Sequence, residues 1–150
     1  MALPQTNMDT DTDKAKEVAE LLRGAGLKLT AQRLAVVRCL VGDESHPTAQ
    51  ELFDRLKPTF PTMSFATVYN TLAALTSVGA CQPVQFGGAA RFDLNVHAHD
   101  HFVCEQCGIV RDVDAGADCV LRSAALADFK VHRVERIYRG QCASCRTTRE

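Results

Sequence analysis

Two cysteine pairs of the form Cys-x-x-Cys restrict the fold of this chain more than any other feature. Cys104 and Cys107 form the first pair, and Cys142 and Cys145 form the second. Each such turn presents two sulfurs from one tight bend, and two turns offer the four thiolates that structural Zn(II) sites use. Gly108 supplies the permissive backbone that such a turn tends to need. The pairs predict a zinc-stapled unit, with redox-active or simply buried cysteines as the alternative.

The remaining sequence favours a metal staple over disulfides. The chain has 150 residues and seven cysteines, and an odd count without a secretion signal argues against a disulfide framework. Residues 1–13 are polar and acidic, which predicts a solvated, mobile arm and not a signal peptide. No apolar run approaches the roughly 18 residues that span a bilayer. We therefore expect a cytoplasmic protein without membrane contact, in which the unpaired cysteines are small buried apolar side chains. These are Cys39, Cys81 and Cys119.

Residues 14–95 show the pattern of four helices followed by a hairpin. The first helix is expected over residues 14–25, and the next three have capping residues at Thr30, Thr48 and Ser64. Glu51 completes a capping box with Thr48. Two strand-like runs, Gln82–Phe86 and Ala90–Leu94, flank Gly87-Gly88. This order is typical of a winged helix-turn-helix, and a small helical domain with an incidental hairpin is the alternative.

The chain changes character after Asn95, where we place the boundary between two domains. Short strand-like runs at His99–Cys104, Ile109–Val113 and Lys130–Tyr138 surround one helix expected at about Asp118–Ala127. The predicted fold class is α+β. It consists of a mobile arm (1–13), a winged-helix DNA-binding domain (14–95) and an α/β metal-binding and dimerisation domain (96–150). The net charge of the chain is −1, but residues 14–95 hold nine Lys/Arg against seven Asp/Glu, and this balance of +2 gives weak support for a nucleic-acid partner.

A second group of candidate metal ligands lies in the segment His97-Ala-His99-Asp100-His101. Alternate residues of a strand share one face, so the three imidazoles would point the same way. Three aligned imidazoles favour a metal site, and an exposed polar strand face is the alternative. The spacing lacks one residue of the H-x-H-x-D-H motif of metallo-β-lactamase-like hydrolases, and the chain is too short for that fold.

The helix that begins after Ser64 carries a third candidate site. Thr67 and Asn70 fall on the side opposite Val68 and Leu72, where they could meet base edges or phosphates. An amphipathic core helix with some exposed polar residues would show the same pattern.

Together these motifs resemble those of the ferric uptake regulator (Fur) family over residues 14–146. The matching segments are Gly26–Arg33, His46–Ala49, Ala66–Asn70, Arg91–Asp93, His99–His101 and the two cysteine pairs. The resemblance implies a homodimer that represses genes when a regulatory divalent metal is bound. It also implies structural zinc on Cys104, Cys107, Cys142 and Cys145, and double-stranded, palindromic operator DNA as the partner.

The resemblance further implies a regulatory Fe(II) or Mn(II) site. By motif position its ligands would be His46, Asp93, His99, His101 and Asp112. Three imidazoles and two carboxylates suit such ions better than ions that seek thiolates. DNA contacts carry over to Lys28, Tyr69 and Asn70, with Arg33, Ser64 and Thr67 as further candidates. His97 has no counterpart in this set, and His132 could join Asp100 in a further metal site.

Asp93 and Asn70 make the chain most similar to the peroxide-sensing PerR branch, since iron sensors more often carry Glu and Arg there. In that branch Fe(II) reacts with hydrogen peroxide, and a ligating histidine, here His46 or His99, is oxidised. Three alternatives remain: a regulator that responds to iron, manganese or zinc without sensing peroxide, a zinc-dependent hydrolase, and a zinc-stapled interaction module. No additional acid–base pair supports an enzyme.

Overall fold

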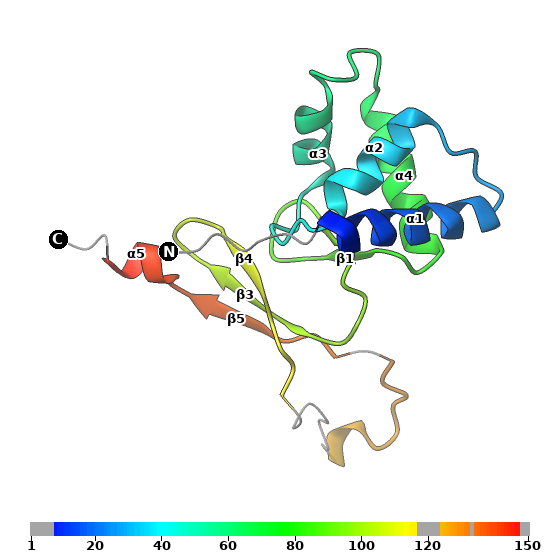
Figure 1. Ribbon diagram of the computed structural model, residues 1–150. Coiled ribbons are helices and arrows are strands. Elements are labelled where there is room, and N and C mark those ends of the chain that lie inside the picture. The colour runs from blue at the N-terminus through cyan, green and yellow to red at the C-terminus, as the bar shows by residue number, and fades with distance from the viewer. Residues whose placement is uncertain (1–7, 117–123, 133, 148–150) are drawn as a thin grey trace. The chain divides into compact units, whose positions relative to one another are not determined.

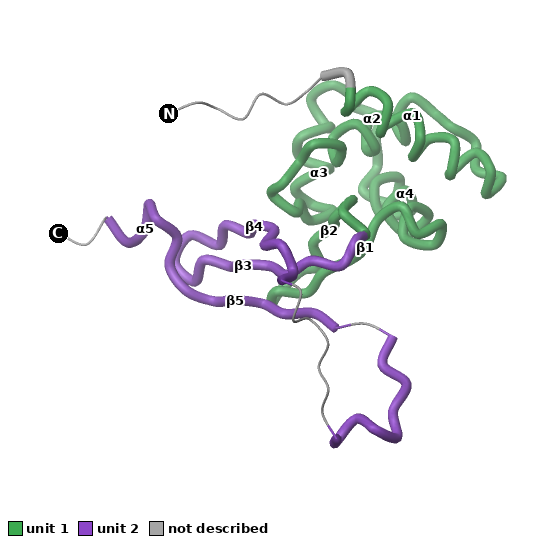
Figure 2. Tube along the Cα trace, turned by 60° about the horizontal axis from the view of Figure 1, so that its bottom comes forward, with its two compact units in different colours: residues 1–96 green, residues 97–150 purple. Residues whose placement is uncertain are grey.

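The computed structural model describes residues 8–116, 124–132 and 134–147. The chain divides into two compact units, residues 1–96 (unit 1) and residues 97–150 (unit 2), coloured separately in Figure 2. Within the described ranges, no helix combines the length and apolar character needed to cross a membrane.

Unit 1 consists of four helices followed by a two-stranded sheet (Figure 1). The elements are α1 (Met8–Gly24), α2 (Ala31–Leu40), α3 (Ala49–Leu56), α4 (Phe65–Ser77), β1 (Gln82–Val84) and β2 (Arg91–Asp93). The three predicted caps are confirmed. The side chains of Thr30, Thr48 and Ser64 each accept a hydrogen bond from the backbone N–H of the residue three positions later. The capping box of Thr48 and Glu51 is also present.

The helices of unit 1 enclose one apolar core, and the hairpin follows it. Val18, Leu52, Leu72 and Leu75 are among its most deeply buried side chains. Strands β1 and β2 pair antiparallel, with Gln82 opposite Asp93. The turn between them places Gly87 and Gly88 at φ 102° and 80°, a region that side chains other than glycine rarely adopt. Helices followed by such a hairpin form the predicted winged helix-turn-helix.

The first helix begins earlier than the sequence pattern suggested. Helix α1 begins at Met8, so the acidic stretch assigned to a mobile arm is helical from that residue onward. The physical reason is that a carboxylate near a helix N-terminus is stabilised by the helix dipole, and Asp11 lies in this first part of α1. Residues 1–7 lie outside the described residues.

Unit 2 contains a three-stranded sheet and a short terminal helix. The elements are β3 (Asp100–Cys104), β4 (Val110–Val113), β5 (Ile137–Gly140), a 3-10 helix (Ala124–Leu126) and α5 (Ala143–Thr147). Strand β3 is central, with β4 antiparallel on one side and β5 parallel on the other. The mixture of helix and sheet confirms the α+β class.

The strand and the helix that were expected in the second half of unit 2 differ from the structure or lie partly outside the described residues. The predicted strand Lys130–Tyr138 begins only at Ile137, because β5 can pair only along β3 and its first partner there is His101. Of the helix expected at about Asp118–Ala127, Ala124–Leu126 forms a 3-10 helix. Residues 117–123, with Cys119, lie outside the described residues.

Candidate metal centres and nucleic-acid interface

The four paired cysteines converge at one end of the unit 2 sheet. Cys104 ends β3, Cys107 follows in a turn, Cys142 comes just after β5, and Cys145 lies in α5. One sulfur from each lies within 4.8 Å of all the others. The Sγ atoms of Cys107 and Cys142 are 3.8 Å apart. A tetrahedral Zn(II) with bonds of about 2.3 Å spaces its sulfurs by about 3.8 Å, so the cluster fits this ion.

Backbone groups shape this cluster and change the acidity of its thiols. Hydrogen bonds from the backbone N–H groups of Cys107 and Cys142 lower the pKa of the Cys104 thiol to about 6. A hydrogen bond with Cys142, together with burial, raises the pKa of Cys145 to about 12. The thiols of Cys104 and Cys145 are therefore shifted in opposite directions within one cluster. A Zn(II) ion bound among the four cysteines would stabilise the thiolate forms.

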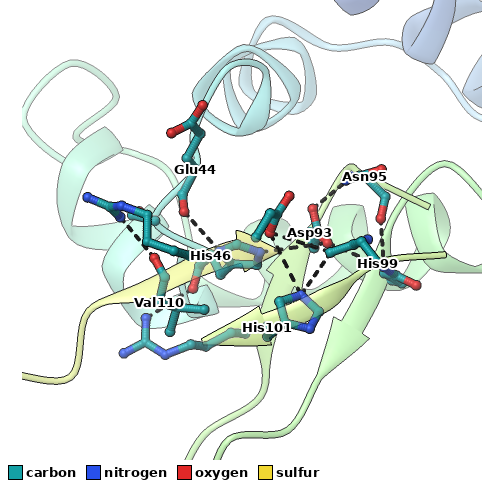
Figure 3. Close-up of polar contacts among 12 residues, drawn as sticks. Glu44, His46, Asp93, Asn95, His99, His101 and Val110 are labelled. Atoms are coloured by element: carbon teal, nitrogen blue, oxygen red, sulfur yellow. Dashed lines mark hydrogen bonds and ion pairs between the residues drawn. The ribbon is translucent and has the colours of Figure 1, made fainter. Parts of the chain in front are cut away.

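In unit 1, His46 and Asp93 form a buried pair (Figure 3). The segment before α3 runs along β2, where Phe92 donates its N–H to the carbonyl of Pro47. This brings Nε2 of His46 to 3.7 Å from Oδ2 of Asp93. Asp93 also receives hydrogen bonds from the Asn95 backbone at 2.7 Å and the Gln82 side chain at 3.3 Å. The carboxylate is thereby fixed beside the imidazole.

The backbone of His46 is strained and held from several directions. Its φ is 54°, the only positive value at a non-glycine residue among the described residues. Its Nδ1 lies 2.9 Å from the carbonyl oxygen of Glu44, which can only accept. The guanidinium of Arg91 donates to the carbonyl of His46 at 3.0 Å. Because Nδ1 carries the proton in this contact, a neutral His46 presents a lone pair at Nε2, the atom that faces Asp93.

In unit 2, His99, His101 and Asp112 bring three further donor atoms together. His101 on β3 pairs directly with Asp112 on β4. The Nε2 atoms of His99 and His101 lie 2.9 Å apart, and Oδ1 of Asp112 lies 3.4 Å and 3.9 Å from them respectively. The expected strand face of three imidazoles is not formed, because β3 begins only at Asp100 and His97 is exposed before it. His99, directly before β3, nevertheless brings its ring to that of His101. Two imidazoles and a carboxylate form a nitrogen and oxygen set suited to Fe(II) or Mn(II).

The structure does not support the further metal site that the sequence suggested for Asp100 and His132. Arg136 and Tyr138 contact both carboxylate oxygens of Asp100. This describes a structural carboxylate and gives no support to a shared metal site with His132, which is exposed. His97 is also exposed, but its backbone carbonyl lies 2.7 Å from Nδ1 of His99 and orients that ring.

Of the lone cysteines, burial raises the pKa of Cys81 to about 12 and also raises that of Cys39.

The candidate DNA-contact residues of unit 1 differ in how free they are to meet a ligand. Tyr69 and Asn70 are exposed on α4, and Tyr69 is 56% accessible. Ser64 caps α4, and its hydroxyl lies 2.9 Å from that of Thr67. The guanidinium of Arg33 donates to the carbonyl of Lys28, whose own side chain is exposed. Tyr69 and Asn70 therefore form an accessible face of α4.

Arg91 is a contributor that sequence reasoning gave no role. It contacts the His46 carbonyl and the Glu51 carboxylate, and so joins β2 to the capped start of α3. Its partners lie 45 and 40 positions away in the chain. The sequence marks Arg91 only as part of the matching segment Arg91–Asp93, and that segment does not indicate which carbonyl oxygen would accept its hydrogen bond.

The sequence model of the ferric uptake regulator family matches residues 24–139. The chain belongs to this family. The peroxide-responsive repressor PerR of Staphylococcus aureus is 40% identical over 129 residues, which are 83% of this chain and 86% of that protein. A solved structure of PerR from Streptococcus pyogenes is 31% identical with a TM-score of 0.51, covering 88% and 92%. The Helicobacter pylori ferric uptake regulator shares the fold, with a TM-score of 0.73, 17% identity and coverage of 93% and 96%.

Proposed function

We propose that this ferric uptake regulator family member is a metal-dependent transcriptional repressor that senses peroxide. Its relative in S. aureus, 40% identical, is named as a peroxide-responsive repressor. The observation that carries the proposal is the nitrogen and oxygen donor set, in which each of the two units contributes histidine and aspartate. Such a set favours a divalent ion such as Fe(II) or Mn(II), whereas the four-cysteine site suits Zn(II).

Two metals with separate roles follow from the two donor sets. Zn(II) on Cys104, Cys107, Cys142 and Cys145 would staple unit 2, and because Zn(II) has no redox chemistry it would not itself react with peroxide. The regulatory Fe(II) or Mn(II) would be held by His46, Asp93, His99, His101 and Asp112. Because these ligands come from both units, one shared ion would favour a single arrangement of the units. It does so only by binding that arrangement more tightly than others.

The partner that we propose is double-stranded operator DNA with palindromic half-sites, bound by a homodimer in the cytoplasm. The two-fold symmetry of a dimer is matched by a palindrome. Tyr69 and Asn70 on the exposed face of α4 would read bases, while Lys28, Arg33, Ser64 and Thr67 would contact or position phosphates. This assigns the chain a regulatory role and no catalytic one.

Peroxide would act on the ligands themselves. Fe(II) held by this donor set would supply the redox chemistry, and hydrogen peroxide would be the two-electron oxidant. One peroxide oxygen would be added to the ring of His46 or His99, and the other would leave as water. An oxidised ring would be a weaker ligand, so the ion would be lost and repression would end. Asp93 is one carbon shorter than Glu, and this length would set the coordination that permits the reaction.

Mass spectrometry tests the proposal. The Fe(II)-loaded chain treated with peroxide is expected to gain one oxygen on the peptide that contains His46 or His99, whereas the Mn(II)-loaded chain is not. Asp93→Glu serves as the matched variant, which should keep its metal response and lose much of its peroxide response. Oxygen found only on cysteines, or on neither histidine, would reduce the function to a metal-responsive repressor.

A further inference from the structure

Asp100 lies between two candidate metal ligands in the sequence, and a two-residue clamp holds its carboxylate. The residue is 3% exposed. The Arg136 guanidinium donates from Nε to Oδ1 at 3.1 Å, and its Nη2 lies 2.9 Å from Oδ2. The Tyr138 hydroxyl donates to Oδ2 at 3.2 Å. A bidentate contact of this kind fixes geometry more tightly than a single hydrogen bond does.

The backbone of Arg136 contacts the next residue of β3. The N–H of His101 donates to the carbonyl oxygen of Arg136 at 3.0 Å. Arg136 therefore holds Asp100 through its side chain and His101 through its backbone, immediately before the parallel pairing of β5 with β3 begins at Ile137. A shift of β5 along β3 would break both contacts at once.

Convergence of the imidazoles requires a fixed strand. The Nε2 atoms of His99 and His101 must point to one place, although the side chain between them belongs to the clamp. Residues that hold metal ligands in orientation are themselves important for affinity, and their loss typically weakens metal binding. The clamp is positioned to do this for both histidines.

We propose that Arg136 is the positioning residue for the metal-binding edge of unit 2 and sets its affinity for the regulatory ion. This proposal rests on the function proposed above in one respect, namely that the regulatory ion binds at this edge of unit 2. Arg136 is not a member of the proposed donor set. It acts through Asp100 and through the backbone of His101.

The test uses the full zinc-loaded chain and three variants. Arg136→Met removes the guanidinium, and Arg136→Lys keeps one charge without the bidentate contact. Because Arg136→Met leaves a buried carboxylate uncompensated and could fail to fold, the double variant Asp100→Asn with Arg136→Met removes both charges. Arg139→Met, an exposed arginine on the same strand, is the matched control. Zinc content and the urea midpoint confirm which proteins are folded.

Titration calorimetry with Mn(II) supplies the first readout. The Arg136→Met and double variants should bind Mn(II) roughly 10–100-fold more weakly, the range for lost outer-shell partners. Arg136→Lys should recover part of the affinity, and Arg139→Met should match the unmodified chain. Unchanged affinity in a folded double variant would overturn the proposal.

Imidazole NMR of the chain loaded with zinc alone supplies a readout that does not depend on Mn(II). The ring signals of His99 and His101 should broaden or shift in the double variant and stay unchanged in Arg139→Met. Identical ring signals in the double variant would also overturn the proposal. If the unmodified chain bound no Mn(II), the proposed function would fail, and these spectra alone would decide the role of Arg136.

Discussion

The Nε2 atoms of His99 and His101 lie 2.9 Å apart. Nδ1 of His99 faces the carbonyl oxygen of His97 at 2.7 Å and must carry the proton there, so a neutral His99 has a lone pair at Nε2. Two lone pairs repel at this distance. Either His101 donates a proton into the gap or a cation occupies it, and the carboxylate of Asp112 at 3.4 Å and 3.9 Å favours a cation.

The first prediction separates His99 from its neighbour His97. His99→Ala should weaken Mn(II) binding by more than the roughly 10–100-fold typical of a lost outer-shell contact, because a direct ligand is removed. His97→Ala should leave binding unchanged, since only its backbone carbonyl takes part. Calorimetry on the zinc-loaded chain measures both. Equal losses in the two variants would show that the imidazole of His97 is a ligand as well.

The second prediction concerns the turn after Cys107. Gly108 has φ +73°, and a Cβ there would meet no atom within 4 Å. Gly108→Ala should therefore destabilise the zinc-loaded chain by about 1–2 kcal/mol through backbone strain alone, measured by urea unfolding. Gly116→Ala is the control, because that glycine has open space and no positive φ. X-ray absorption should show four sulfur ligands on zinc in all three proteins, and fewer sulfurs would refute the four-cysteine site.

The third prediction concerns the exposed face of α4. Tyr69→Ala should weaken operator binding by about 1–3 kcal/mol if the ring meets a base. Leu21→Ala, which changes an exposed apolar side chain of α1, is the control. Gel-shift titrations at several salt concentrations measure both, and the Tyr69 variant should keep the salt dependence that phosphate contacts produce. Normal binding by Tyr69→Ala would mean that another helix reads the DNA.

The fourth prediction is a pH dependence in the loop that precedes His46. Burial raises the pKa of Asp43, but hydrogen bonds from Ser45 and Arg55 outweigh burial and hold it below 3.8. A lowered pKa means that the ionised carboxylate stabilises the fold above pH 3.8, and that this contribution is lost as the pH falls further. Asp43→Asn should cost about 0.5–1 kcal/mol at pH 7, because the ion pair is partly exposed.

Urea unfolding across pH 3–7 would check this prediction, with the zinc-loaded and unmodified chains treated alike. The difference between Asp43→Asn and the unmodified chain should shrink below pH 3.8. Glu44→Gln, at the exposed neighbouring position, should show no such difference. A difference that stays constant with pH would mean that the charge of Asp43 contributes nothing.

Sequence reasoning succeeded where the determining interactions are local. Thr48 and Glu51 lie three residues apart, so their capping box can be recognised without a fold. The cysteine pairs are equally local, which is why their clustering in unit 2 could be anticipated. The expected face of three imidazoles was only partly right, because β3 begins at Asp100 and His97 is exposed before it. The acidic start of α1 was misjudged because carboxylates suit a solvated arm and a helix N-terminus alike.

The interactions that sequence reasoning missed join distant positions. Arg136 meets Asp100 across 36 residues, and Arg91 meets His46 across 45. Each depends on strand register, which a run of apolar residues does not specify. The same limit explains why β5 was placed too early. Its start is set by where β3 offers partners and not by its own composition.

The parallel pairing of β3 and β5 has a consequence for a cut chain. Cys104 and Gly140, the last residues of the two strands, pair directly, so both cysteine pairs lie at the same end of the sheet. Proteolysis between Val113 and Ile137 would yield two fragments that each retain two thiolates and one side of the strand pairing. With zinc bound, these fragments should remain together through purification, and a chelator should release them. The metal would thus replace a covalent link that the protease had removed.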